Sequence, residues 1–196
     1  MIKTAINSTF PHLHANIVKY DKSIFVTDYT EKTKLTHPKR AVEIFSPHPC
    51  TDNECFELKN NIDLEIDTII LDNNSFKYSN GLSKSQCETT VFPSTSLSDS
   101  WFLLLELKYS NKPVNNASNL KKAIKQLFKT RYHYIQENVI SNKNTQYLIA
   151  SLPMQSEPFL NFSLTPAYLL KLKTKRNIIL RLKNDIEIID NQLLSV

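Results

Sequence analysis

The stretch Trp101–Lys108 reads WFLLLELK, an apolar run that one glutamate interrupts and one lysine ends. Such a run, with Ser and Asp residues before it and a Ser-Asn-Lys-Pro segment after it, is typical of a buried β-strand. Side chains alternate along a strand, so Glu106 and Lys108 share one face. Phe102 and Leu104 lie on that same face and should be buried. A carboxylate and an ammonium group there need partners or a metal, which makes this strand a candidate functional site.

The composition around this strand is that of an ordinary globular chain. Its 196 residues, of which 41% are hydrophobic and 22% charged, are enough for one domain with a sizeable core, and we expect a single domain over 1–196. Gly81 is the only glycine. Rossmann fingerprints and Walker-type loops need several glycines, so both are excluded.

Charge and cysteine content restrict the binding partners and the cellular compartment that we expect for the protein. The formal net charge of +5 and a pI near 9.0 are compatible with a polyanionic partner. No stretch has 18 consecutive apolar residues, and the first residues lack a long apolar region, so we expect no membrane span, no secretory signal and a cytoplasmic location. Three cysteines, Cys50, Cys55 and Cys87, are an odd number without framework spacing, which agrees with a reducing compartment.

The periodicity of the remaining chain predicts an α/β protein of the α+β type. The expected strands are 23–29, 40–45, at least one within 55–72, 86–92, 101–109, 146–152, 178–182 and 186–189. One amphipathic helix is expected from Ala117 or Ser118 to Val139, with Asn116 or Ser118 as its N-cap. Thr165-Pro166 resembles the start of a second helix. Residues 1–22 fit a short helix or a strand.

Two carboxylates are predicted to meet at one end of this sheet. Glu88 lies in the strand QCETTVF, 18 positions before Glu106, and a hairpin between the two strands brings both acids together. Two carboxylates beside a lysine suit Mg²⁺ or Mn²⁺, which prefer oxygen ligands and leave positions for water and phosphate. A cation there polarises a phosphodiester and activates water, while Lys108 orients that water or neutralises phosphate charge.

This order of elements resembles the PD-(D/E)xK, or restriction-endonuclease-like, superfamily. The resemblance covers about residues 62–152 and rests on CETTVFP (87–93), FLLLELKYS (102–110) and AIKQL (123–127). It implies a central mixed β-sheet flanked by helices. The N-terminal segment 1–61, expected to be a strand-rich elaboration, and the C-terminal extension 153–196 match no family pattern.

The resemblance also implies roles for four residues. Glu88 corresponds to the first metal-binding acid, Glu106 to the second metal ligand, Lys108 to the catalytic lysine and Gln126 to the helix glutamine that some branches use near the site. Most members have aspartate at the position of Glu88. The implied function is Mg²⁺- or Mn²⁺-dependent endonucleolytic hydrolysis of DNA, rather than RNA, in a phage-defence, restriction or repair system, as a homodimer or with partner subunits. The alternative is a non-catalytic module of the same fold that binds nucleic acid or protein.

Basic residues of the helix and the tail are candidates for contacts with phosphate. This set comprises Lys121, Lys122, Lys125, Lys129, Arg131, Lys173, Lys175 and Arg176. The alternative is a solvated charged face. Tyr132, His133 and Tyr134, near the helix end, fit base stacking, core packing or plain exposure.

Simpler interpretations remain for the other candidates. Glu106 and Lys108 also fit an exposed salt bridge, and Glu88 and Gln126 also fit solvated positions. Cys87 is expected in the core. His48-Pro49-Cys50 with Cys55 lacks the second ligand pair of a zinc site, and the alternation of His12 with His14 is best explained by chance.

Overall fold

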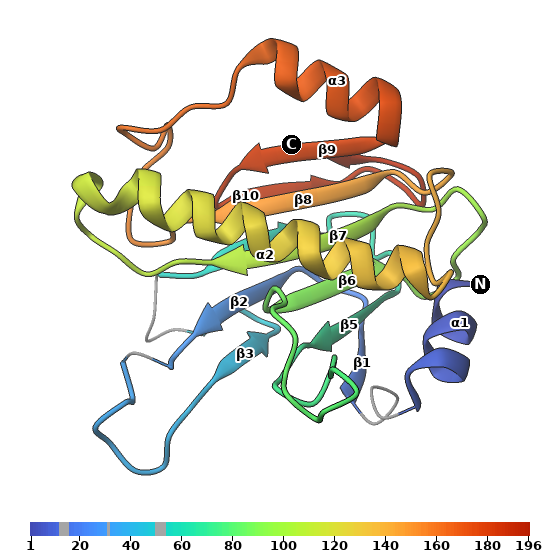
Figure 1. Cartoon of the computed structure of the whole chain (residues 1–196), viewed down its shortest axis with the longest axis horizontal. Helices are drawn as coiled ribbons and strands as arrows, with labels where there is room; N and C mark the ends of the chain where they lie inside the picture. The colour runs from blue at the N-terminus through green and yellow to red at the C-terminus, as the bar shows by residue number, and fades with distance from the viewer. Residues whose placement is uncertain (12–15, 31, 50–53) are drawn as a thin grey trace.

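The computed structural model describes residues 1–11, 16–30, 32–49 and 54–196 (Figure 1). His12, His14 and Cys50 lie outside these ranges, so the structure says nothing about them. The helices are α1 (Ile2–Thr9), α2 (Asn116–Gln136) and α3 (Pro166–Arg176), and a short 3-10 turn (Pro113–Asn115) precedes α2. The strands are β1 (Ile17–Tyr20), β2 (Ile24–Asp28), β3 (Val42–Phe45), β4 (Phe56–Lys59), β5 (Ile66–Ile70), β6 (Thr89–Pro93), β7 (Phe102–Leu107), β8 (Gln146–Ser151), β9 (Ile178–Leu182), β10 (Asp185–Ile188) and β11 (Leu194–Ser195).

The described strands form two mixed sheets. The central sheet has the order β1-β5-β6-β7-β8-β9, and the second sheet has the order β11-β10-β4-β2-β3. In the central sheet β1, β5, β6 and β7 are antiparallel neighbours, whereas β7, β8 and β9 are parallel. Parallel neighbours need a crossover connection, and the helices α2 and α3 provide it.

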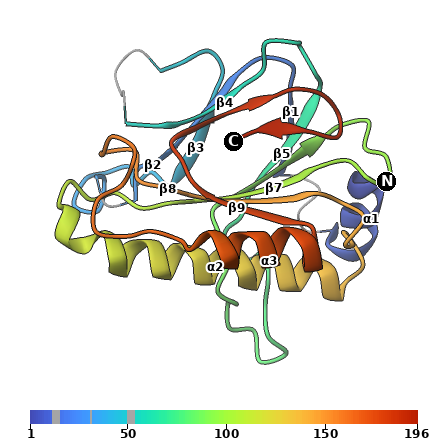
Figure 2. The ribbon, with the colours of Figure 1, turned by 90° about the horizontal axis from the view of Figure 1, so that it is seen from above.

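The molecule has three layers, which are seen edge-on in Figure 2. Helices α1, α2 and α3 pack on one face of the central sheet, and the second sheet covers the opposite face. The expected α+β class with a central mixed sheet is confirmed. The expectation that helices flank this sheet holds for one face only, because strands from both ends of the chain cover the other.

Strand β7 connects these layers because both of its faces are buried. Phe102 and Leu104 pack against α2 in one core, whereas Leu103 and Leu105 pack against the second sheet in the other. Every residue of β7 is buried. Burial on both faces accounts for the nearly continuous apolar run in this part of the sequence.

Helix α2 begins and ends differently from its prediction. Asn115, not Asn116 or Ser118, occupies the N-cap position, and the Asn116 side chain instead bonds to Gln155 at 2.9 Å. At the other end the helix stops at Gln136, because Asn138 has a positive φ of 55°. The amide of Val139 donates back to Tyr134 at 3.0 Å, which is the hydrogen-bond pattern of a Schellman cap.

The other helices and strands lie close to the positions predicted from the sequence. Helix α3 starts at Pro166, and the Thr165 hydroxyl accepts a hydrogen bond from the amide of Tyr168, as predicted for an N-cap. The segment 55–72 contains two strands, β4 and β5, and residues 17–20 form β1. None of the helices in the described ranges has the length and apolar character needed to cross a membrane.

Segments from the two ends of the chain meet in the second sheet. Strand β4, from the N-terminal segment, pairs in parallel with β10, from the C-terminal extension, and places Leu58 opposite Ile186. Strands β1 and β9 form the two edges of the central sheet. The two flanking segments therefore pair with each other in the second sheet, and with the strands of residues 62–152 at the edges of the central sheet.

Candidate active site

Glu106 lies near the end of β7, and Glu88 lies just before the neighbouring strand β6. Residue Glu88 directly precedes β6, and Thr89 faces Leu105 in the ladder. The amide of Glu88 also donates to the carbonyl of Leu105, at 3.1 Å, so two residues of one strand meet one residue of the other. This is the pattern of a β-bulge, which re-aims side chains at a strand end.

Glu106 is fully buried, with an exposed fraction of 0%. Its Oε1 accepts a hydrogen bond from Lys108 Nζ, and its Oε2 has no hydrogen-bond partner among the described residues. The Lys108 side chain remains 19% exposed. The interpretation of Glu106 and Lys108 as an exposed salt bridge is therefore wrong for Glu106, because α2 covers this face of β7.

The Glu88 carboxylate reaches the residue between Glu106 and Lys108. Its Oε2 accepts a hydrogen bond of 3.0 Å from the amide of Leu107. Glu88 itself is half-buried. Two acids and one lysine therefore meet around a single strand end.

The charges of the site act on one another in a poorly solvated environment. Burial raises the pKa of Glu106 to about 7, although Lys108 favours its ionised form. Burial also raises the pKa of Glu88 well above its usual value, and the nearby charge of Glu106 raises it further. Removal from water penalises an ionised carboxyl, and a second carboxylate adds repulsion. A bound cation would relieve both effects.

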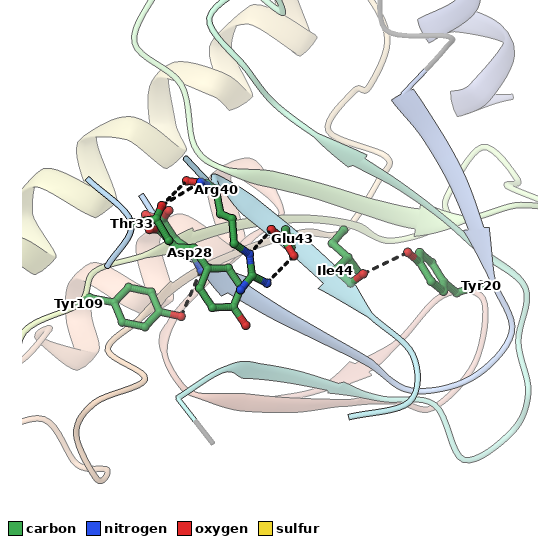
Figure 3. A network of polar contacts seen from close by, with 8 residues as sticks. Tyr20, Asp28, Thr33, Arg40, Glu43, Ile44 and Tyr109 are labelled. Atoms are coloured by element: carbon green, nitrogen blue, oxygen red, sulfur yellow. Dashed lines mark hydrogen bonds and ion pairs between the residues drawn. The ribbon is translucent and has the colours of Figure 1, made fainter. Parts of the chain in front are cut away.

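A third carboxylate, Asp28, enters the site from the second sheet. It lies at the end of β2, and its charge raises the pKa of both Glu88 and Glu106. The amide of Asp28 donates to the hydroxyl of Tyr109 at 3.2 Å, which ties β2 to the residue after Lys108 (Figure 3). Sequence reasoning missed Asp28, because it lies 60 positions before Glu88 in a segment without a recognised pattern.

The donor set fits a hard divalent cation with few protein ligands. Glu106 Oε2 is a buried oxygen that has no hydrogen-bond partner among the described residues, which suits a metal ligand. In the ranges 1–11, 16–30, 32–49 and 54–196, no three His, Cys, Asp or Glu side chains are grouped closely enough to hold an ion. Mg²⁺ commonly binds through one or two carboxylates and completes its shell with water and phosphate. Glu88 and Glu106 are the residues that would form such a pair.

Gln126 acts on the segment that leads to Glu88. Its Nε2 donates to the carbonyl of Gln86 at 2.9 Å, and its Oε1 is buried without a partner among the described residues. One turn later, the Thr130 hydroxyl accepts a hydrogen bond of 2.7 Å from the amide of Cys87. Cys87 is only 1% exposed, which confirms its expected core position. Helix α2 thus positions Glu88 through its backbone, and Thr130 was not signalled by the sequence.

The predicted phosphate-binding residues fall into two groups. The first half of α2 holds Lys121, Lys122 and Lys125, which are exposed, and Lys122 lies close enough to lower the pKa of Glu106. Arg131 lies about 14 Å further along the helix than Lys122, at a rise of ~1.5 Å per residue. It bonds to Gln146, which pairs with Phe102 at the opposite end of β7.

The second group surrounds this Arg131 end of the sheet. The end of α3 carries the exposed residues Lys173, Lys175 and Arg176. The pKa of Arg131 is lowered mainly by burial, and the nearby charge of Arg176 lowers it further. Lys129 is half-buried on α2 between the two groups. Only the first group borders the acids.

The aromatic residues near the end of α2 pack mainly inward. Tyr134 is fully buried and lies edge-on to Phe102, with ring centroids 5.2 Å apart, so core packing is confirmed for it. His133 lies 5.0 Å from the ring of Phe76. Tyr132 is 55% exposed.

Among the described residues, His48 and Cys55 are the candidates for a zinc site. His48 Nε2 and Cys55 Sγ are 3.5 Å apart, and Cys50 lies outside the described ranges. His48 also packs edge-on to Phe25, at 4.6 Å between ring centroids. A packing role accounts for these contacts.

No model of a known protein family, no curated protein and no solved structure matches the chain. The feature of the molecule that bears on function is the geometry at the end of β7. That geometry combines two acids, a lysine and a positioning glutamine on elements that follow one another along the chain.

Proposed function

We propose that the protein is a Mg²⁺- or Mn²⁺-dependent nuclease of the PD-(D/E)xK type that hydrolyses phosphodiester bonds of DNA. The observation that supports it most is the hydrogen bond from the amide of Leu107 to the Glu88 carboxylate. This bond places Glu88 beside the strand residues Glu106 and Lys108. The connection from β7 through α2 to the parallel strand β8 agrees with the same family pattern.

Each side chain has a separate task in this proposal. Glu88 and Glu106 hold the cation, which when bound acts as a Lewis acid toward phosphate and favours ionisation of water. Lys108 is partly exposed beside them and is suited to orient water or to neutralise a phosphate oxygen. Gln126 and Thr130 hold the backbone before Glu88 in place. Lys121, Lys122 and Lys125 supply positive charge beside the acids for a DNA backbone.

The test is cleavage of plasmid and linear DNA with Mg²⁺ or Mn²⁺, and with EDTA as the metal-free control. We expect Glu106→Ala and Lys108→Ala each to lower the cleavage rate by about 100-fold or more, because each removes a group at the reacting phosphate. Glu65→Ala is the matched control, because Glu65 is 55% exposed and precedes β5 at the opposite end of the sheet. Cleavage that survives both site substitutions would overturn the proposal.

A second candidate is a non-catalytic module that binds DNA or protein within a larger assembly. The full burial of Glu106 and its bond to Lys108 favour it, since both oppose entry of a cation. It predicts no cleavage with either metal, together with DNA binding that weakens steeply as salt is raised. We also propose a role in phage defence, restriction or repair, a cytoplasmic location, and assembly as a homodimer or with partner subunits.

A further inference from the structure

The loop between β2 and β3, residues 29–41, projects from the body of the molecule (Figure 1). Its sequence contains Lys32, Lys34, Lys39 and Arg40 against one acid, Glu31. Leu35, at its tip, is 98% exposed. A leucine exposed to this extent does not contribute to the core of this chain, and its side chain is accessible to another molecule.

The base of the loop is built rigidly from its own side chains (Figure 3). Arg40 forms a two-pronged ion pair with Glu43, with both contacts at 2.7 Å, and its guanidinium lies 3.5 Å from the centre of the Tyr29 ring. The Thr33 hydroxyl accepts from the amide of Arg40 at 2.8 Å and donates to the carbonyl of Tyr29 at 2.9 Å. These bonds close the loop at its base. Residues 34–39 form its tip, in which the amide and the hydroxyl of Thr36 both donate to the carbonyl of Thr33 at 3.1 Å.

The same base is fixed beside the candidate active site. Tyr109 directly follows Lys108, and its hydroxyl accepts from the amide of Asp28 and donates to the carbonyl of Glu54 at 2.8 Å. Lys32 Nζ lies 5.5 Å from the centre of the Tyr109 ring. The base of the loop therefore lies against the residue that directly follows Lys108.

The tip matches the chemistry of a DNA duplex. Lysines at its two sides suit phosphates, and an exposed aliphatic residue between them suits insertion beside a base step, which is how apolar side chains enter the minor groove. The acids Glu88, Glu106 and Asp28 at the site would repel a polyanion. In the neighbouring loop Lys32 and Arg40 form ion pairs with Glu54 and Glu43, and the lysines of the tip add positive charge.

We infer that the tip of the β2–β3 loop is a duplex-binding arm, in which Lys34 and Lys39 contact phosphates and Leu35 contacts a base step. The inference rests on the proposed function for its substrate class, and it adds a binding element from a segment outside the family resemblance. The loop contributes to affinity and to the choice of duplex over single-stranded DNA, whereas the acids carry out hydrolysis.

The test measures binding of a fluorescent DNA duplex in EDTA, so that cleavage plays no part. We expect the double variant Lys34→Ala/Lys39→Ala to bind about tenfold more weakly, with the slope of log affinity against log salt reduced by about two. We expect Leu35→Ser to bind the duplex roughly tenfold more weakly with an unchanged salt slope, because an apolar contact releases no counterions. A 2-aminopurine placed in the duplex should brighten with the wild type and not with Leu35→Ser, because insertion unstacks the base.

The controls are Leu97→Ser and Lys143→Ala, which change an exposed leucine and an exposed lysine at the opposite end of the central sheet. Equal losses in these controls, or arm variants that bind as the wild type does, would overturn the inference. If such arm variants also cleave normally while Glu106→Ala does not, the proposed function stands and only the arm is refuted. A wild type that binds no DNA would overturn both. Leu35-dependent binding to anionic phospholipid vesicles, without Leu35-dependent binding to DNA, would assign the tip to a membrane surface and refute the arm.

Discussion

At the scale of single residues, the site depends on how far burial alters the charge of Glu106. The carboxyl is fully buried and one of its oxygens has no hydrogen-bond partner among the described residues. Lys108 compensates only part of the cost of ionisation, since the pKa of Glu106 is still raised to about 7. The residue is thus poised between a neutral form that suits the folded protein and an ionised form that suits a metal.

This balance predicts a pH-dependent stability. The folded protein holds a proton on Glu106 up to about pH 7, whereas the unfolded chain releases it near the usual value of 4.5. The contribution of Glu106 to the free energy of unfolding should therefore fall as pH rises from 4.5 to 7, by about 3 kcal/mol at most, and stay low above pH 7. Glu106→Gln should remove the part of this dependence that Glu106 contributes, leave the part that the raised pKa of Glu88 contributes, and melt at a higher temperature than the wild type at pH 8. Equal pH profiles for the two proteins, measured by thermal melting in EDTA, would contradict the raised pKa.

Metal binding should show the opposite dependence on pH. A cation needs ionised carboxylates, so the rise in melting temperature caused by Mg²⁺ or Mn²⁺ should grow between pH 6 and pH 8. At a metal concentration ten times the dissociation constant, the stabilisation is about 1.4 kcal/mol, or roughly 3–6 °C for a chain of this size. Glu106→Gln should show little of it. A shift that is as large in that variant as in the wild type would place the metal elsewhere.

At the scale of elements, α2 both covers the central sheet and sets the position of Glu88. Its apolar residues Leu120, Ala123 and Leu127 pack in the core as the periodicity predicts. Its polar residues Gln126 and Thr130 bond to the backbone of the segment just before Glu88. The sequence predicts α2 only as an amphipathic helix that covers the sheet, and the structure shows that it also holds the backbone before Glu88 in place.

Substitution at Thr130 tests this support. Thr130→Val keeps the shape of the side chain but leaves the buried amide of Cys87 without its acceptor, which costs about 1–3 kcal/mol. We expect a lower melting temperature together with weaker Mg²⁺ stabilisation, because Glu88 loses its fixed position. Thr174→Val is the matched control, since the Thr174 hydroxyl also donates to the carbonyl four residues earlier, but on an exposed face of α3. Metal stabilisation that is unchanged in Thr130→Val would mean that α2 does not position Glu88.

At the scale of the whole molecule, the second sheet is what distinguishes this protein from a sheet with helices on both faces. Strands β2, β3 and β4 come from the first 61 residues, and β10 and β11 come from the last 44. They cover Leu103 and Leu105 of β7 and bring Asp28 to the acids. Both ends of the chain are therefore needed to complete the core and the surroundings of the site.

The segment that resembles the nuclease family should not fold alone. A fragment of residues 62–152 lacks β9, β1 and the entire second sheet, so one apolar face of β7 would be exposed to water. We expect circular dichroism to show no cooperative melting for this fragment, in contrast to the full chain. A sharp transition of the fragment would show that the second sheet is dispensable for the core.

The sequence by itself determined the features that depend on near neighbours along the chain. Alternation and apolarity at 101–108 predict β7, three- and four-residue spacing predicts α2, and the order of Glu88, Glu106 and Lys108 along a hairpin predicts their proximity. Only the tertiary structure decided that Glu106 is buried, that Asp28 and Tyr109 join the site, and that the basic residues divide into two groups. Burial, charge interactions and the pairing of β4 with β10 depend on distances between segments far apart in the chain, for which local periodicity holds no information.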